Sequence, residues 1–213
     1  MGVGLRLSLY ECVPGEAGVA AQAGSVLFAY APSGDVTVDG APLGPDEGAF
    51  AAADGRVAGP GKVWLYEVAD AGSPFLEGPA LLRSQRLSLA FAAPYVVRAD
   101  RIESRPGDQT PRHGHRGPGI RRLVFGCILA EVGEGIERID AGHSWFETGH
   151  DMVVGTNIGE TNGAFVRVMV LPAELEGGKS SFMPADETEA AKPRRVMSRL
   201  FGERMLPGEG TAA

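Results

Sequence analysis

Short β-prone runs separated by turn residues are the feature that most limits what this chain can fold into. Glycine (31 residues) and proline (15) are numerous for a chain of 213 residues that is 44% hydrophobic, and almost no helical periodicity is present before residue 185. A series of short strands at this spacing is typical of an all-β barrel or sandwich and not of a helical bundle. The strands expected are 3–10, 25–30, 36–38, 63–68, 81–91, 95–103, 123–132, 136–139, 145–147, 152–155 and 165–171.

Local signals predict where some elements begin and end. The dipeptide Asp39-Gly40 predicts a hairpin turn. Residues 186–192 are expected to form one or two helical turns, begun by Asp186 and ended before Pro193. Residues 196–200 are expected to form a second helical segment, and residues 207–213 to be disordered.

The composition excludes several classes of function. The formal net charge is -7, and no basic stripe is interleaved with aromatic residues, so nucleic acid is not an expected partner. Cys12 and Cys127 lie far apart, which argues against a disulfide framework and fits a reducing cytoplasm. Residues 1–13 lack the features of a signal peptide, and no apolar run approaches the ~20 residues of a membrane span. A cytoplasmic protein without membrane contact is expected.

The two halves of the chain resemble each other after a shift of about 96 positions. Three pairs of segments keep the same order: 43–50 with 139–146, 25–30 with 121–126, and 63–68 with 165–170 once a short insertion around 159–163 is allowed. This order predicts a barrel that is duplicated within one chain.

The duplication suggests a division into three parts. A first barrel is expected in residues 1–75, a second in 76–175, and a short helical or extended tail in 176–213, with the Gly- and Pro-rich stretch 69–79 as linker. The first barrel contains no histidine, so we expect it to have a structural role. All four histidines lie in the second half.

Two of these histidines define the candidate site. His113 and His115 lie within a Pro- and Gly-rich stretch, one residue apart. On a short strand, residues i and i+2 point to the same face, so both imidazoles can be aimed at one point. Neutral imidazole is a ligand of zinc, iron, nickel, copper and manganese. The spacing therefore indicates a possible metal site.

Gly107, five intervening residues and then His113-x-His115 resemble the first sequence motif of the cupin superfamily, G-x5-H-x-H. The resemblance covers most of residues 95–172, with a degenerate echo over roughly 20–70. It implies a jelly-roll β-barrel, here in a bicupin arrangement. It also implies a divalent metal held by the two histidines, a glutamate shortly after them, and a histidine of a second motif.

The chain departs from this pattern at two ligands. Residues 118–120 read Pro-Gly-Ile where the glutamate is expected, and Met152 occupies the position of the second-motif histidine. His150 shares strand parity with Met152, so it is a candidate to reach the cavity, or else to lie in a turn. The metal set implied is His113, His115 and His150, holding iron, nickel, manganese or zinc. The alternative is that the two motif histidines merely line a pocket.

Further residues are candidates for the pocket or for orienting the imidazoles. Gln109 and Glu147 are candidate partners of the histidines, and Met152 is a further candidate for the pocket. Arg121 and Arg122 enter a strand, so one faces inward and one outward. An inward Arg121 beside a metal would favour an anionic substrate, and its alternative role is a salt bridge to Glu131 or Glu147.

The resemblance leaves more than one function open. One is a metal-dependent enzyme, dioxygenase-like or isomerase-like, acting on a small organic molecule. The alternative is a non-catalytic module that binds or senses a small molecule, such as an organic anion, without metal. A third is a structural or assembly protein. By analogy with cupins, the expected assembly is a homodimer.

Overall fold

The computed structural model describes residues 4–89 and 94–206. Nearly all its regular structure is β-strand, apart from the 3-10 helix η1 (Ala173–Leu175) and the single helical turn α1 (Glu187–Ala190). The expected all-β class is therefore confirmed. None of the described helices is long and apolar enough to cross a lipid bilayer.

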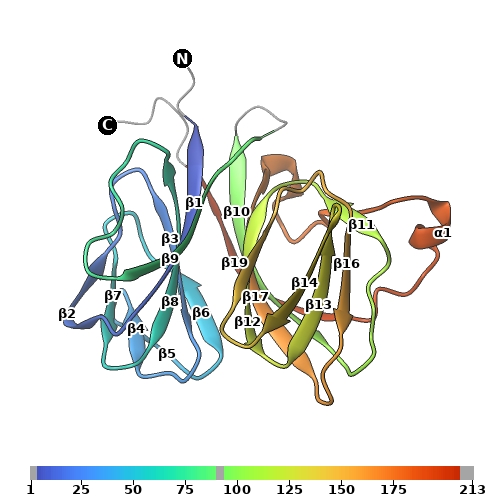
Figure 1. Cartoon of the computed structure of the whole chain (residues 1–213). Coiled ribbons are helices and arrows are strands. Elements are labelled where there is room, and N and C mark those ends of the chain that lie inside the picture. The colour runs from blue at the N-terminus through green and yellow to red at the C-terminus, as the bar shows by residue number, and fades with distance from the viewer. Residues whose placement is uncertain (1–3, 90–93, 207–213) are drawn as a thin grey trace. The chain divides into compact units, whose positions relative to one another are not determined.

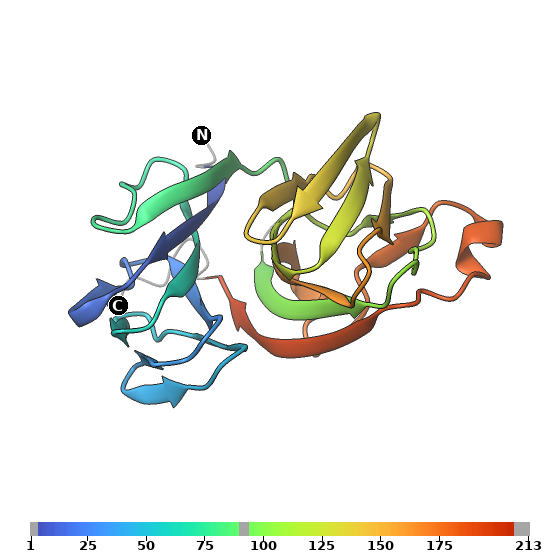
Figure 2. The same ribbon diagram turned by 60° about the horizontal axis from the view of Figure 1, so that its bottom comes forward.

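The chain divides into two compact units. In the described ranges, unit 1 comprises residues 4–88, 94–97 and 201–206, and unit 2 comprises residue 89 and residues 98–200. Each unit contains two β-sheets, and the curvature of the strands is visible in two views (Figures 1 and 2).

Unit 1 is built from a five-stranded and a four-stranded sheet, with orders β6-β3-β8-β1-β9 and β2-β7-β4-β5. Its strands are β1 (Leu5–Cys12), β2 (Gly15–Ala20), β3 (Val26–Ala31), β4 (Val36–Val38), β5 (Ala41–Leu43), β6 (Glu47–Phe50), β7 (Arg56–Gly59), β8 (Val63–Asp70) and β9 (Ala80–Arg86). The predicted hairpin turn at Asp39-Gly40 joins β4 to β5. Apolar side chains from both sheets form the core between them.

Unit 2 carries two five-stranded sheets, with orders β15-β12-β17-β10-β19 and β14-β13-β16-β11-β18. Its strands are β10 (Tyr95–Ser104), β11 (His113–His115), β12 (Gly119–Phe125), β13 (Cys127–Val132), β14 (Gly135–Asp140), β15 (Ser144–Glu147), β16 (Val153–Asn157), β17 (Gly163–Pro172), β18 (Phe182–Pro184) and β19 (Met197–Met205). The ends of β10 and β19, residues 95–97 and 201–205, group with unit 1. As predicted, Asp186 caps the N-terminus of α1 by accepting a hydrogen bond from the Glu189 amide.

The two units have the same topology. The five-stranded sheet of unit 1 corresponds strand for strand to β15-β12-β17-β10-β19, and its four-stranded sheet, taken from β5 to β2, corresponds to β14-β13-β16-β11. Only β18 has no counterpart among the described residues of unit 1. The expected duplication of a jelly-roll barrel is therefore confirmed.

The strand register shows which residues are equivalent. If Phe50 of β6 corresponds to Phe146 of β15, as the internal repeat indicates, their cross-strand partners Phe28 and Ile120 correspond too. The predicted match between β8 and β17 then holds residue for residue. The predicted match between β3 and β12 is wrong by four positions, because the connections to β6 and β15 differ in length.

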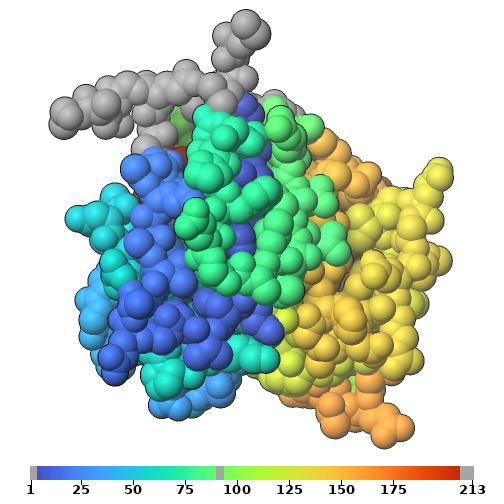
Figure 3. All heavy atoms as spheres, turned by 60° about the vertical axis from the view of Figure 1, so that its left-hand side comes forward, coloured from blue at the N-terminus to red at the C-terminus, as the bar shows by residue number. Residues whose placement is uncertain are grey.

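The end of unit 1 and the stretch after β8 differ from those expected. Unit 1 continues past residue 75 to Ser88, because β9 pairs with β1. In Figure 3 the side chains of β9, in green, lie beside the N-terminal strands, in blue. β1 is consequently an inner strand of its sheet. The stretch after β8 is not a simple linker, because its carbonyls at Ser73 and Pro74 accept hydrogen bonds from Arg6.

The C-terminal residues are more than a tail. Residues 176–200, hereafter the strap, belong to unit 2, where β18 pairs with β11. Residues 197–200 begin strand β19 and not the helical segment expected for 196–200. The predicted disorder of 207–213 falls outside the described residues.

The long strand predicted for residues 123–132 is two strands. β12 and β13 are separated at Gly126, whose φ of 90° lies in the region that favours glycine. A Cβ there would lie 2.5 Å from the Cα of Gly163. This break lets the chain pass from one sheet of unit 2 to the other.

Candidate functional site

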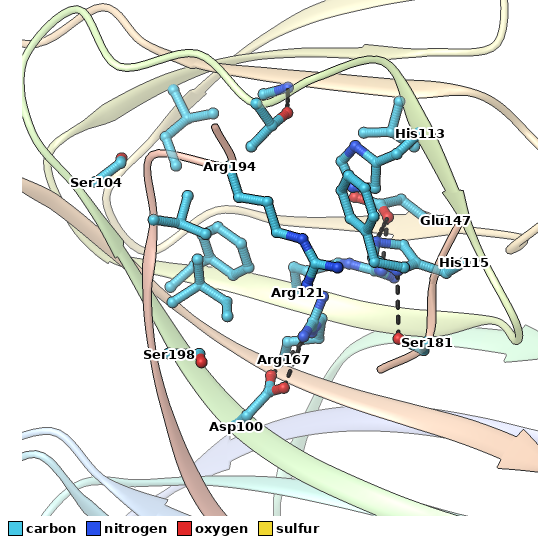
Figure 4. Close-up of a pocket in the computed structure, with 18 of the residues that line it drawn as sticks. Asp100, Ser104, His113, His115, Arg121, Glu147, Arg167, Ser181, Arg194 and Ser198 are labelled. Atoms are coloured by element: carbon cyan, nitrogen blue, oxygen red, sulfur yellow. Dashed lines mark hydrogen bonds and ion pairs between the residues drawn. The ribbon is translucent and has the colours of Figure 1, made fainter. Parts of the chain in front are cut away.

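Unit 2 encloses a cavity of about 360 Å³ between its two sheets. One part of the wall is apolar and is formed by Ile102, Ile128, Trp145 and Phe165. The rest is polar and strongly charged, with residues from β10, β11, β12, β15, β16 and β17 and from the strap (Figure 4). This volume and mixed lining are typical of sites for small molecules.

His113 and His115 lie side by side on the cavity wall, on β11, and their rings are 4.8 Å apart at 88°. His113 Nδ1 lies 2.7 Å from the Pro111 carbonyl oxygen, and because a carbonyl only accepts, this nitrogen carries the proton. Burial lowers the pKa of His113, which keeps the ring neutral and Nε2 a hydrogen-bond acceptor. In the described part of the chain, no group donates a hydrogen bond to that Nε2.

His115, by contrast, has both ring nitrogens near polar side chains. Its Nδ1 lies 3.4 Å from Ser181 Oγ, and its Nε2 lies 3.5 Å from Glu147 Oε2. Burial, followed by the positive charges of Arg167 and Arg121, lowers the pKa of His115 well below its ordinary value. The ring is therefore neutral at pH 7.

Glu147 is surrounded by donors. Its Oε1 accepts a 2.9 Å hydrogen bond from Trp145 Nε1, and Arg121 Nη2 lies 2.6 Å from its Oε2. Arg121 also donates to the Gly119 carbonyl oxygen at 2.6 Å and is only 1% exposed. Of the two roles considered for Arg121, the structure shows the ion pair, with Glu147 and not Glu131 as partner. Arg122 does not line the cavity; its Nε donates to the Gly142 carbonyl.

A second buried ion pair lines the cavity beside the first. Arg167 on β17 binds Asp100 on β10 through two hydrogen bonds of 2.8 and 2.6 Å. Burial opposes the charge of Arg167, but the Asp100 carboxylate outweighs it and raises the pKa of the guanidinium. Arg98 also lines the cavity and donates to the carbonyls of Leu175 and Lys179.

The strap supplies the last charged group. Arg194 lies against the Phe182 ring, with its guanidinium carbon 4.1 Å from the ring centroid. Phe182 stacks in turn on His113 at 4.3 Å and 20°. In Figure 4 the guanidinium of Arg194 points into the pocket, toward Arg121 and Arg167.

Three of the predicted site residues lie outside the cavity wall. His150 and Gln109 are exposed, and Met152 is half-buried, away from the lining. The reason is register: His113 pairs with Val153, and Val153 and Gly155 face the cavity, so residues 150 and 152 have the wrong parity. The structure brings together His113, His115, Arg121 and Glu147 and leaves His150, Met152 and Gln109 apart.

The arrangement does not fit the predicted three-histidine metal set. His150 is exposed and outside the lining, and the described ranges contain no group of three or more His, Cys, Asp or Glu side chains placed to hold a metal ion. The Glu147 oxygen that faces His115 is already paired with a guanidinium. The positive charge of that guanidinium, beside the imidazoles, repels a metal cation at the same place.

Sequence reasoning missed Asp100, Arg167, Phe182 and Arg194. Arg167 had a signal, since it is the one charged residue in the apolar run 165–171. A lone charge in a run that reads as a buried strand needs a partner or a ligand. No such local signal points to Arg194, because its position depends on the path of the strap.

Comparisons with known proteins give the fold its name. No family model matches the chain, and no curated protein sequence matches it. Similar solved structures include AerE from Microcystis aeruginosa, with 13% identity over 79% of this chain and 88% of that one and a TM-score of 0.54.

Two further similar structures carry the same fold. A cupin 2 conserved barrel domain protein from Leptotrichia buccalis has 12% identity, covers 80% of this chain and 85% of that one, and gives a TM-score of 0.51. For a deletion mutant of oxalate decarboxylase from Bacillus subtilis the identity is 11%, the coverage 91% and 71%, and the TM-score 0.52. With the strand order of both units, these likenesses make the chain a protein of the cupin fold, with one barrel in each unit.

Proposed function

We propose that unit 2 binds a small organic anion in its arginine-lined cavity, and that this binding does not depend on a metal ion. Arginine is suited to such a ligand because its planar guanidinium binds a carboxylate through two parallel hydrogen bonds. The apolar wall of Ile102, Ile128 and Phe165 would hold the uncharged part of the ligand.

The observation that carries this proposal is the contrast between equivalent positions of the two barrels. In unit 1, Ala29 on β3 lies opposite Leu65 on β8. In unit 2, the equivalent pair is Arg121 opposite Arg167. Ala29 and Leu65 are part of the apolar core of unit 1 and are fully buried.

Glu147 follows the same rule, since its equivalent in unit 1 is Ala51, which is also in the apolar core. The fold itself therefore does not require charges at these places. Unit 1 has a buried ion pair of its own, Arg6 with Glu67, but at other positions. Burying ion pairs is costly or at best neutral for stability, so the charges at these positions of unit 2 are best explained by a ligand.

A second candidate function is the metal-dependent enzyme, dioxygenase-like or isomerase-like, that the cupin motif implies. It is favoured by one observation: next to His115, the Nε2 of His113 receives no hydrogen bond from any described residue. With only these two imidazoles as protein ligands, the remaining positions of an ion would fall to solvent or substrate. The ion pair of Arg121 with Glu147 weighs against this function.

Isothermal titration calorimetry on protein treated with EDTA separates the two functions. The titrants are benzoate, lactate and pyruvate, each repeated on protein reconstituted with iron, nickel, manganese or zinc. Anion binding predicts saturable binding of at least one acid to the EDTA-treated protein, with one site per chain. Binding that appears only after metal is added, together with about one metal per chain, would overturn the proposal in favour of the enzyme.

A further inference from the structure

We propose that Arg194 of the strap is the residue that selects the ligand, by binding its carboxylate at the mouth of the cavity, and that the ligand is a monoanion with an apolar body. This inference rests on the proposed anion-binding function and adds to it a specificity-determining residue and a ligand class.

The arginines that line the cavity differ in their hydrogen-bond and ion-pair partners. Arg121 and Arg167 are each paired with a carboxylate, and Arg98 donates to two backbone carbonyls. Within the described ranges, Arg194 has one long hydrogen bond, 3.3 Å to Ser180 Oγ, and its contact with a phenyl ring. Among the described residues, no carboxylate is its partner. Arg194 is exposed, so its guanidinium is accessible to a ligand carboxylate, the group that a guanidinium pairs with best.

The side chains that line the cavity carry a net positive charge. Among the described residues, four arginines and three carboxylates line the cavity, so these side chains carry one positive charge in excess. One anionic group on the ligand balances that excess. A second would have to be buried against Asp100 and Glu147, at a Coulombic cost that grows in a low-dielectric site.

The strap holds Arg194 through an aromatic stack and a turn at the next residue. Its guanidinium, the Phe182 ring and the His113 imidazole form a continuous stack. The next residue, Arg195, has a φ of 50°, an uncommon conformation for a residue with a side chain, and its guanidinium lies 3.7 Å from Asp108. Of the two neighbouring arginines, Arg194 lines the cavity and Arg195 does not. Strained backbone of this kind is concentrated at ligand clamps.

The remaining wall of the cavity is apolar. Ile102, Ile128, Trp145 and Phe165 form an apolar surface that a planar hydrocarbon body can cover. Benzoate therefore serves as the probe, with benzamide as its neutral counterpart of the same shape and phthalate as the corresponding dianion.

The experiment measures the affinity of the full chain for these three compounds by calorimetry. Wild type is expected to bind benzoate at least 10-fold more tightly than benzamide or phthalate. Arg194→Gln is expected to lose about 10- to 100-fold in benzoate affinity, as for the loss of a charged hydrogen bond, with benzamide unchanged. Arg194→Lys should recover part of the loss.

Lys192→Gln is the matched control. It removes the same charge two residues away, from a side chain that is exposed and paired with Glu189, so its benzoate affinity should equal that of wild type. Benzoate binding by Arg194→Gln at wild-type affinity would overturn the role of Arg194 alone, and tighter binding of phthalate than benzoate would overturn the monoanion. If wild type binds none of the three compounds at millimolar concentration, both the clamp and the anion-binding function are contradicted.

Discussion

Arg167 and Asp100 form a buried, two-bonded ion pair on the cavity wall, and unit 1 carries Leu65 at the position of the arginine. We expect Arg167→Leu alone to lower the free energy of unfolding by about 3–5 kcal/mol, because Asp100 is left buried and unpaired. The double variant Asp100→Leu/Arg167→Leu should have the same free energy of unfolding as wild type or one up to about 4 kcal/mol higher, as for other buried ion pairs replaced by apolar residues. Urea denaturation measures both.

The same double variant should lose benzoate binding while it keeps the fold. A stable, folded double variant with wild-type affinity would show that the pair serves neither stability nor the ligand. That result would contradict the proposed function, because the function is inferred from charges that unit 2 carries where unit 1 has apolar residues.

Glu67 is the corresponding case in unit 1, since it is fully buried and pairs with Arg6 at 3.3 Å while accepting from Tyr10 Oη at 3.0 Å. Burial raises the pKa of Glu67 in the folded state, against the opposing effect of its hydrogen bonds. The folded protein therefore binds this proton more tightly than the unfolded chain does. The stability that Glu67 contributes is full below its unfolded pKa and is lost as pH rises through the folded value.

The measurement is the free energy of unfolding of wild type minus that of Glu67→Gln, across pH 4 to 8. We expect this difference to fall as pH rises, because only wild type has to bury the charge. A difference that rises with pH would mean that Arg6 and Tyr10 outweigh burial.

At the scale of elements, Gly126 and Gly142 allow the sheet change of unit 2 to be tested with a matched pair. Both have positive φ, 90° and 84°, but a Cβ on Gly126 meets the backbone of Gly163, whereas one on Gly142 meets nothing within 4 Å. Gly142→Ala should cost about 1–2 kcal/mol from the left-handed conformation alone. Gly126→Ala should cost about 1–3 kcal/mol more because of the clash. Equal midpoints in chemical denaturation would show that the turn opens freely.

Element by element, the sequence was informative where a pattern is local. The alternation and turn signals located most strands, and the i, i+2 spacing of His113 and His115 placed both on one wall. His150 was misjudged because parity was counted from Met152, whereas β16 starts at Val153 and the cavity-facing residues are those in register with His113. A one-residue change of register exchanges the two faces of a strand.

The rest of the site depends on contacts between distant parts of the chain. Asp100 and Arg167 meet across neighbouring strands, 67 positions apart in sequence, so neither identifies the other locally. Arg194 reaches the cavity because the strap pairs β18 with β11 before it turns back. Nothing in the composition of residues 176–200 fixes that path.

At the scale of the whole molecule, one fold is used twice with different interiors. Unit 1 fills its barrel with an apolar core that adjoins the buried Arg6–Glu67 pair, and unit 2 keeps a cavity lined with charges. We therefore expect one ligand per chain, bound in unit 2. Trp145 lines that cavity, and Trp64 lies in unit 1, so the two tryptophans of the chain report on the two barrels separately.

The most direct measurement is a benzoate titration of uniformly ¹⁵N-labelled protein in EDTA, followed through the two indole N–H signals and assigned with Trp64→Phe. The Trp145 indole donates to Glu147 at the cavity wall, so its signal should shift and saturate at one benzoate per chain while the Trp64 signal stays in place. A Trp145 signal that does not move, or that moves only when a metal ion is added, would contradict metal-independent binding of an organic anion in unit 2.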